Sequence, residues 1–281
     1  MLDPTARSLC ITADDYGAAA AYNRAVEELA AAGAVQAVSV MAHRDAALDG
    51  APRLARARVS TGLHLVFTAE RPISQRLGGS PLASASGRMP RSFRQLFLGL
   101  ITRPWAADLL YDEGILQARR MLDAGLPIDF INSHEHTHLF PLLWPTFARL
   151  AQDLGVPAVR AALHQRIDGS PQGWLSAASR ISWARAPLPD RTVMSPLGVG
   201  RAGTLTLGAI EALLTRAFTP PPGARALREL CVHPHPGERE LVGSPAMRRL
   251  VERLGGSPTR PGAPASSKEH AAATAATPPS A

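Results

Sequence analysis

Short apolar runs alternate with helix-length segments along most of this chain, and this alternation limits its fold more than any other feature. Residues 9–13 and 35–41 are strand-like, a segment of helical period at 20–32 lies between them, and a third strand-like run spans 59–67. Strands that alternate with helices in this way form parallel sheets or barrels. The sequence therefore predicts an α/β protein built around parallel strands.

The rest of the chain continues this pattern after one long interruption. Residues 70–104 are rich in Gly, Pro, Ser and Arg, which predicts an excursion that caps a site. Beyond it we expect helices at 106–124, 141–154, 175–184 and 207–218, and strands at 128–132, 157–161 and 227–232. Nothing in the middle resembles a linker, so residues 1–254 are predicted to form one domain, and the Ala-, Pro- and Ser-rich residues 255–281 a disordered tail.

Composition excludes several classes of protein. The 281 residues are 46% hydrophobic, yet no uninterrupted apolar stretch reaches the ~20 residues of a membrane span. The N-terminus lacks a signal-peptide pattern, and the two cysteines, Cys10 and Cys231, lie in apolar strand-like runs rather than in a disulfide framework. We therefore expect a cytoplasmic protein without an integral membrane segment.

The net charge of +7 raises the question of nucleic acid as a partner. Lys268 is the only lysine among 30 basic residues, and the arginines are scattered without interleaved aromatic side chains. This pattern indicates a compositional bias of the source genome, and nucleic-acid binding is not expected.

Three histidines at alternate positions, His134, His136 and His138, follow the predicted strand at 128–132. On an extended segment alternate side chains project to the same face, so these imidazoles would converge. Neutral imidazole is the commonest side-chain metal ligand, which makes a metal site the leading interpretation. A polar strand end that happens to be rich in histidine is the alternative.

Other polar residues follow the remaining strands at equivalent points: Asp14 and Asp15, His64 and His233. Ligands bind beyond the carboxyl ends of parallel strands, so these residues are candidates for one shared site. Each also has a structural alternative, because an Asp here can cap the next helix and a lone histidine can be held by backbone groups.

Neighbouring histidines of one strand cannot all bind one ion without bending the strand, so we expect a single ligand from the triplet. Asp15, His64 and His134 then form the ligand set, which leaves coordination positions open for water and substrate. Asp14 is the predicted proton acceptor, and His233 is the predicted proton donor.

The remaining polar candidates are predicted to line the substrate pocket: His136, His138 and Arg160. Three further histidines have no partner pattern and are expected on the surface or in the tail: His43, His164 and His270.

Four segments of the chain together resemble one known family, the YdjC-like (ChbG/HpnK-type) carbohydrate deacetylases. In chain order they are residues 11–17 (ITADDYG), 61–65 (TGLHL), 132–141 (NSHEHTHLFP) and 229–234 (ELCVHP). The resemblance implies a TIM-like (β/α) barrel related to polysaccharide deacetylases. It also implies one divalent ion, often Mg²⁺ or Zn²⁺, and removal of the N-acetyl group from an amino sugar.

The resemblance assigns roles residue by residue. The family's metal ligands fall on Asp15, His64 and His134, its base on Asp14 and its acid on His233, which are the roles that the strand ends suggest. The acetylated sugar is expected to be part of an oligosaccharide or attached to a lipid such as a hopanoid. A homodimer is a further expectation.

The chain departs from the family in two places. It supplies one helix after His233 before the predicted tail, which leaves closure of the barrel open, and residues 164–203 match poorly. A metal-dependent sugar isomerase or epimerase is one alternative, although such sites usually need more carboxylates at strand ends. A non-catalytic sugar-binding relative is the other, and the intact set of candidate residues argues against it.

Overall fold

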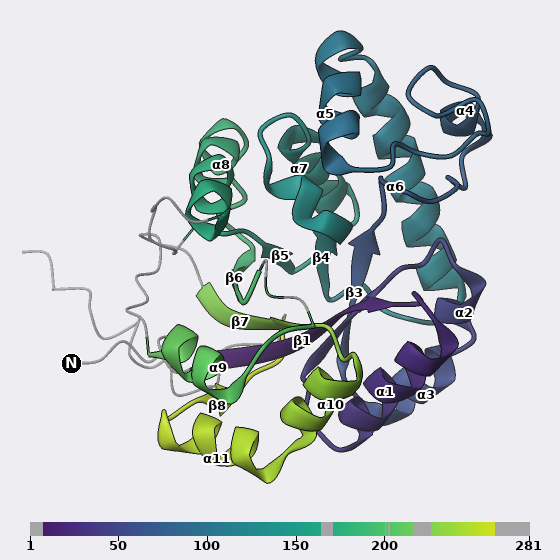
Figure 1. Cartoon of the computed structure of the whole chain (residues 1–281). Helices are drawn as coiled ribbons and strands as arrows, with labels where there is room; N and C mark the ends of the chain where they lie inside the picture. The colour runs from purple at the N-terminus through teal and green to yellow at the C-terminus, as the bar shows by residue number, and fades with distance from the viewer. Residues whose placement is uncertain (1–7, 164–170, 200, 202, 216–225, 262–281) are drawn as a thin grey trace, which may run out of the picture.

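The computed structural model describes residues 8–163, 171–199, 201, 203–215 and 226–261 of the chain. Within these residues parallel strands pair in chain order and close into a barrel, because β7 pairs with β1 (Figure 1). The strands are β1 (Ser8–Tyr16), β2 (Ala37–Val40), β3 (Ser60–Leu65), β4 (Phe130–Ser133), β5 (Ala158–Arg160), β6 (Thr192–Leu197) and β7 (Ala226–Val232). The predicted α/β barrel is confirmed, and it is closed.

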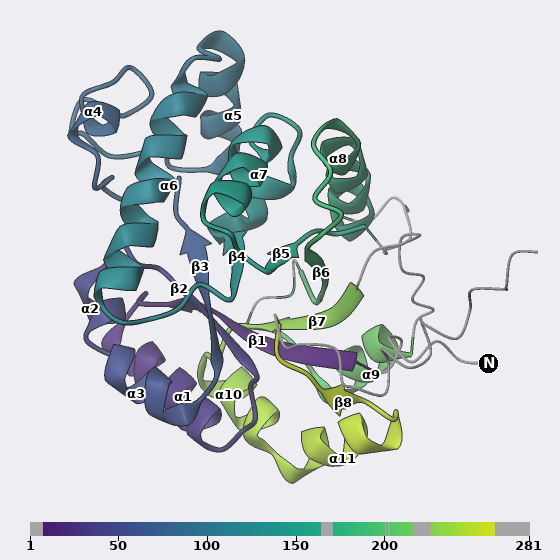
Figure 2. The same ribbon diagram turned by 180° about the vertical axis from the view of Figure 1, so that it is seen from behind.

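Helices surround this barrel on its outside (Figures 1 and 2). They are α1 (Ala20–Ala31), α2 (Asp45–Leu48), α3 (Ala51–Ala57), α4 (Gln75–Gly78), α5 (Phe93–Thr102), α6 (Ala106–Asp123), α7 (Trp144–Asp153), α8 (Pro171–Arg185), α9 (Leu207–Leu214), α10 (Pro236–Gly243) and α11 (Pro245–Arg253). The excursion predicted at 70–104 contains α4 and α5 and no strand. Among the described helices, none combines the length and apolarity needed to cross a membrane.

One layer of side chains fills the amino-terminal end of the barrel. It is formed by inward-facing residues near the starts of the strands: Cys10, Ala37, Phe130, Ala158, Met194 and Leu227. β3 contributes Gly62 beside this layer, where a Cβ atom would lie 2.4 Å from the ring of Phe130. The ring thus occupies the space that a side chain on β3 would need. Because this end is packed, chemistry is confined to the opposite, carboxyl end of the strands.

A short strand, β8 (Ser257–Pro258), pairs in parallel with Ser8 and Leu9 at the start of β1. The backbone N–H of Thr259 also donates to the Leu9 carbonyl oxygen at 2.9 Å. Ordered structure therefore continues past residue 254, where we expected the tail to begin. Residues 262–281 lie outside the described part of the chain.

Candidate active site

Three predicted ligands, Asp15, His64 and His134, converge at the carboxyl ends of β1, β3 and β4. The Asp15 Oδ1 atom lies 3.0 Å from His64 Nε2 and 2.8 Å from His134 Nδ1. One ligand atom from each residue lies within 4.8 Å of the other two. Adjacent ligands that each lie about 2.1 Å from one ion are separated by about 3 Å, so these donors fit a single metal.

A local distortion of β1 turns Asp15 toward this point. Pairing between β1 and β2 shifts register between Ala13 and Tyr16, and Asp15 has a left-handed backbone with φ 59°. Adjacent residues of a regular strand face opposite sides, but this distortion lets Asp14 and Asp15 serve one site. A non-glycine residue in this conformation costs about 1–3 kcal/mol, which the surrounding contacts must offset.

The histidine triplet is not extended, contrary to our expectation. β4 ends at Ser133, and His134–Leu139 forms a 3₁₀ segment in which Glu135 (φ 53°) and His136 (φ 51°) have left-handed backbones. The three imidazoles therefore reach different surroundings rather than one face. His134 alone joins the ligand cluster.

His138 does not line a pocket, so that part of the prediction is wrong. Its side chain is buried, with Nδ1 2.7 Å from Ser133 Oγ, and Nε2 donates to the Arg160 carbonyl oxygen at 3.2 Å. It holds the 3₁₀ segment against β5. His136 differs, because its Nδ1 atom is buried without a hydrogen-bond partner in the described residues. Burial and the nearby Arg160 charge lower the pKa of His136 to about 3, so this ring is neutral.

Asp14 lies deeper in the barrel and is almost completely buried. It accepts hydrogen bonds from Ser39 Oγ at 2.6 Å and from Arg160 Nη1 and Nη2 at 2.7 and 2.9 Å. Burial opposes ionisation of Asp14, but the Arg160 charge outweighs it and holds the pKa of this carboxyl well below its usual range. Asp14 is thus a charged acceptor at neutral pH.

Arg160 was expected in the substrate pocket, and this expectation is wrong. Its side chain is 0% exposed and lies inside the barrel, where it bridges Asp14 and Glu229. Nε and Nη2 donate to the Glu229 carboxylate at 2.8 and 2.6 Å. Sequence reasoning missed Glu229, although an acidic residue in the apolar run of β7 was a usable signal, because buried charges are almost always paired.

The charges of this region favour a cation. Asp14, Asp15 and Glu229 are three carboxylates, and Arg160 is the guanidinium that faces them. With neutral imidazoles the cluster carries two excess negative charges. One divalent ion at Asp15 would balance them, which is a second reason why these residues fit a metal.

Asn132 on β4 orients His64 and was not predicted. Its amide lies 2.7 Å from His64 Nδ1 and contacts Ser39 on its other side. With the amide oxygen turned to Arg160 and Ser39, its nitrogen donates to His64 Nδ1. An ion at His64 Nε2 requires the opposite arrangement, in which Nδ1–H donates to the amide oxygen.

His233 follows β7 and approaches Asp15 from another side. Its Nε2 atom lies 3.8 Å from Asp15 Oδ2, the oxygen that the two other imidazoles leave free. Its side chain is 14% exposed, and its backbone N–H donates to Glu238 Oε1 at 2.6 Å. The ring thus lies at the edge of the site and is mostly buried.

His43 was expected on the surface, yet its side chain is only 3% exposed. Neither ring nitrogen has a hydrogen-bond partner in the described residues, and Nε2 lies 3.9 Å from Glu70. Burial lowers the pKa of His43 to about 4. It lies just beyond the end of β2, whereas His64 lies within β3 near its carboxyl end, and sequence reasoning did not use this position. The other two histidines expected outside the core, His164 and His270, lie outside the described residues.

Comparisons with known proteins show which proteins this chain is similar to. A carbohydrate deacetylase from Vibrio campbellii is 31% identical over 147 residues, covering 52% of this chain and 55% of that protein. A human carbohydrate deacetylase is 30% identical over 193 residues, covering 67% and 58%. The chain thus spans little more than half the length of these relatives.

A crystal structure from Enterococcus faecalis, described as a putative cellobiose-phosphate cleavage protein, shares the fold with a TM-score of 0.69 and 18% identity. The match covers 90% of this chain and 97% of that one. The model of the family described as YdjC-like protein matches residues 8–253. Because this match covers most of the chain, the chain belongs to the YdjC-like protein family.

Proposed function

We propose that this protein is a metal-dependent hydrolase that removes the N-acetyl group from an acetylated amino sugar. The convergence of Asp15, His64 and His134 beside the buried carboxylate of Asp14 carries the proposal. The carbohydrate deacetylases to which the chain is similar support the choice of substrate class. The sugar is free, part of an oligosaccharide, or attached to a lipid such as a hopanoid.

Asp15, His64 and His134 would hold one divalent ion, which supplies Lewis-acid polarisation of the acetyl carbonyl and of the attacking water. One carboxylate and two imidazoles suit zinc or another transition metal at least as well as magnesium, which prefers oxygen ligands. Asp15 and His64 lie on two strands of a closed barrel and His134 directly follows a third, so their positions are fixed before substrate arrives.

Asp14 accepts the proton of the attacking water in this scheme. Arg160 and Ser39 fix the direction of its carboxylate and keep it ionised. His233 donates a proton to the departing amine as the C–N bond breaks, so that acetate and a free amino sugar result. Its position across Asp15 from the two other imidazoles separates the donor from the acceptor.

Acetate release tests the proposal. Purified protein would be supplied with Zn²⁺ or Mg²⁺ and offered N-acetylglucosamine, chito-oligosaccharides and N-acetylated glycolipids. We expect acetate from at least one class and a rate about 10²–10⁴-fold lower for Asp14→Asn. Asp123→Asn, an exposed carboxylate at the end of α6, should retain the full rate. No acetate from any substrate with either ion would contradict the proposal.

A further inference from the structure

Helix α5 presents large apolar side chains to solvent. Leu98 is 64% exposed and Ile101 63%, and Trp105, just beyond the helix, is 53% exposed. The opposite face of α5 already packs inward through Leu96 and Leu100, which are buried. The outer apolar side chains are therefore not needed for the core, and no described residue covers them.

The sequence segment that carries these apolar side chains contains several arginines and no acidic residue. Between Glu70 and Asp108 the sequence contains no Asp or Glu, while six arginines occur there: Arg71, Arg76, Arg88, Arg91, Arg94 and Arg103. Arg91 and Arg94 are exposed and have no acidic partner among the described residues. Arg76 pairs with Asp112 and Arg88 lies 4.0 Å from Glu70, so the positive charge of this surface comes mainly from the other arginines.

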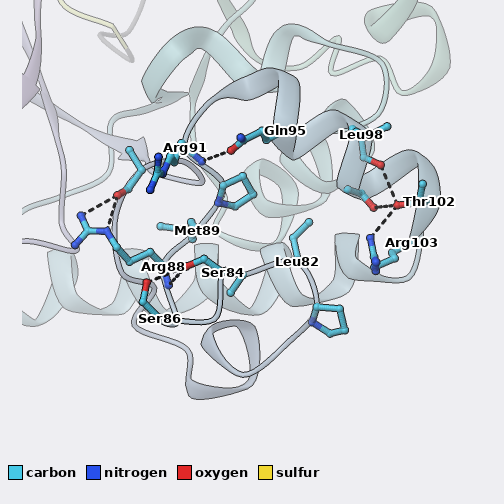
Figure 3. Close-up of a pocket in the computed structure, with 15 residues that line it drawn as sticks. Leu82, Ser84, Ser86, Arg88, Met89, Arg91, Gln95, Leu98, Thr102 and Arg103 are labelled. Carbon is cyan, nitrogen blue, oxygen red and sulfur yellow. Dashed lines mark hydrogen bonds between the residues drawn. The ribbon is translucent and has the colours of Figure 1, made fainter.

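A hollow of about 560 Å³ lies between α5 and the loop before it (Figure 3). Leu82, Met89 and Leu98 supply apolar walls. Three of the arginines line the same hollow: Arg88, Arg91 and Arg103. Apolar walls beside guanidinium groups match a molecule with a hydrocarbon part and an anionic part.

We propose that the α5 surface, defined as residues 81–105, docks on the surface of a bilayer that contains anionic phospholipid. Leu98, Ile101 and Trp105 would enter the headgroup layer, and the arginines would contact lipid phosphates. Aliphatic and Trp side chains on one face, with arginines beside them, are the pattern of helices that lie in a membrane interface.

Two other occupants fit this surface less well. A second copy of the chain in a symmetric dimer would bring the same arginines face to face with no carboxylate between them. Nucleic acid would use the arginines but leaves exposed Leu98 and Ile101 without a role. An anionic lipid surface uses both features together.

The α5 surface is connected to the candidate site through aromatic contacts. The Phe140 ring lies 6.0 Å from the Phe93 ring and 4.8 Å from the Phe97 ring. Phe140 directly follows the 3₁₀ segment that begins with His134. Docking would thus bring the bilayer close to elements that contact the candidate site. Membrane binding can be measured without turnover, so its test does not depend on the proposed activity.

Vesicle flotation tests the proposal. Wild-type protein would be mixed with vesicles of phosphatidylcholine alone, or of phosphatidylcholine and phosphatidylglycerol in equal parts. We expect flotation mainly with the anionic vesicles, weakened by salt. Leu98→Ser combined with Ile101→Ser should lower the partition coefficient about tenfold or more. Arg91→Gln combined with Arg94→Gln should lower it by about fivefold for each arginine and flatten its salt dependence.

Matched variants elsewhere on the surface serve as controls. Leu122→Ser removes a 49% exposed leucine at the far end of α6, about 25 Å along the helix from Trp105. Arg248→Gln combined with Arg249→Gln removes two exposed arginines of α11. Both controls should float as the wild type does, and circular dichroism should show that all variants are folded.

Four outcomes would overturn the proposal. The first is wild-type protein that remains in the dense fraction with both vesicle types, and the second is a Leu98 and Ile101 variant that floats as the wild type does. Polyglutamate could also displace the wild type and that variant from vesicles equally well. This result would indicate an acidic protein partner instead of a bilayer. Sedimentation equilibrium that shows a dimer lost in the variant, without flotation of the wild type, would indicate self-association.

Discussion

Arg160 holds Asp14 through two hydrogen bonds, of 2.7 and 2.9 Å, in a space from which water is excluded. The same guanidinium also holds Glu229. A buried ion pair of this kind adds little to stability compared with well-packed apolar residues in the same place. Loss of one partner is costly, however, because it leaves charges unpaired in a low-dielectric interior.

Arg160→Met should therefore lower the free energy of unfolding by about 3–5 kcal/mol, because it leaves Asp14 and Glu229 buried and unpaired. Urea denaturation measures this change. Arg76→Met provides the control, because Arg76 is 76% exposed beside Asp112 and such pairs contribute at most about 1 kcal/mol. If both substitutions lowered the free energy of unfolding equally, the contacts of Arg160 with Asp14 and Glu229 would not be the buried interaction described above.

Loss of one ligand should remove the metal. His64→Ala and His134→Ala should each weaken zinc binding by about 100-fold or more, because two donors remain where three converged. Mass spectrometry of metals in purified protein and competition with a chelator measure the loss. His235→Ala is the matched control, since this ring packs 5.5 Å from the Tyr22 ring outside the ligand cluster. Undiminished zinc in His134→Ala would refute the ligand assignment.

The stability of the fold should fall in mild acid because of His43. The pKa of His43 is lowered to about 4 in the fold, whereas an unfolded histidine has a pKa of about 6.5. As pH falls from about 6.5 to about 4 the unfolded chain gains a proton that the fold excludes, so stability declines by up to about 3 kcal/mol.

His43→Gln should remove this part of the pH dependence while other acid-sensitive groups remain. Chemical denaturation of wild type and variant at several pH values between those limits gives the difference. If the free energy of unfolding changes with pH in the same way for wild type and variant, His43 is not held neutral by the fold.

Gly62 should tolerate no side chain. Gly62→Ala places a Cβ 2.4 Å from the Phe130 ring and should cost about 1–3 kcal/mol of stability through overpacking. Combination with Phe130→Leu should recover part of the loss, which thermal denaturation of both variants would reveal. Gly208→Ala on α9 is the control, because its Cβ meets nothing within 4 Å and the substitution should stabilise the helix by about 0.5–1 kcal/mol.

Strand periodicity was sufficient to predict an α/β protein with a parallel sheet or barrel, and the family resemblance selected the barrel. The strand ends indicated the residues that gather at its carboxyl end. Asp15, His64 and His134 each follow a readable apolar run, and parallel pairing alone brings such positions together. The conformation of the histidine segment could not be predicted, because Glu135 and His136 adopt left-handed backbones and no glycine there indicates a turn.

The burial of Arg160 could not be predicted from the local sequence pattern either. An arginine at the end of a three-residue strand is usually solvated, and the carboxylates that allow its burial lie 146 and 69 residues away in sequence. The β8 strand lies in a segment with no apolar period, so its side-chain pattern did not predict the pairing with β1.

Closure of the barrel joins β1 to β7, so β1, which is synthesised before the other barrel strands, waits for the last of the seven. At synthesis rates of about 5–20 residues per second, the roughly 200 residues between them take about 10–40 seconds to appear. During that interval one edge of β1 has no partner, and its exposed backbone groups are open to pairing with other chains. Slower translation should therefore lengthen the time during which this edge of β1 is exposed.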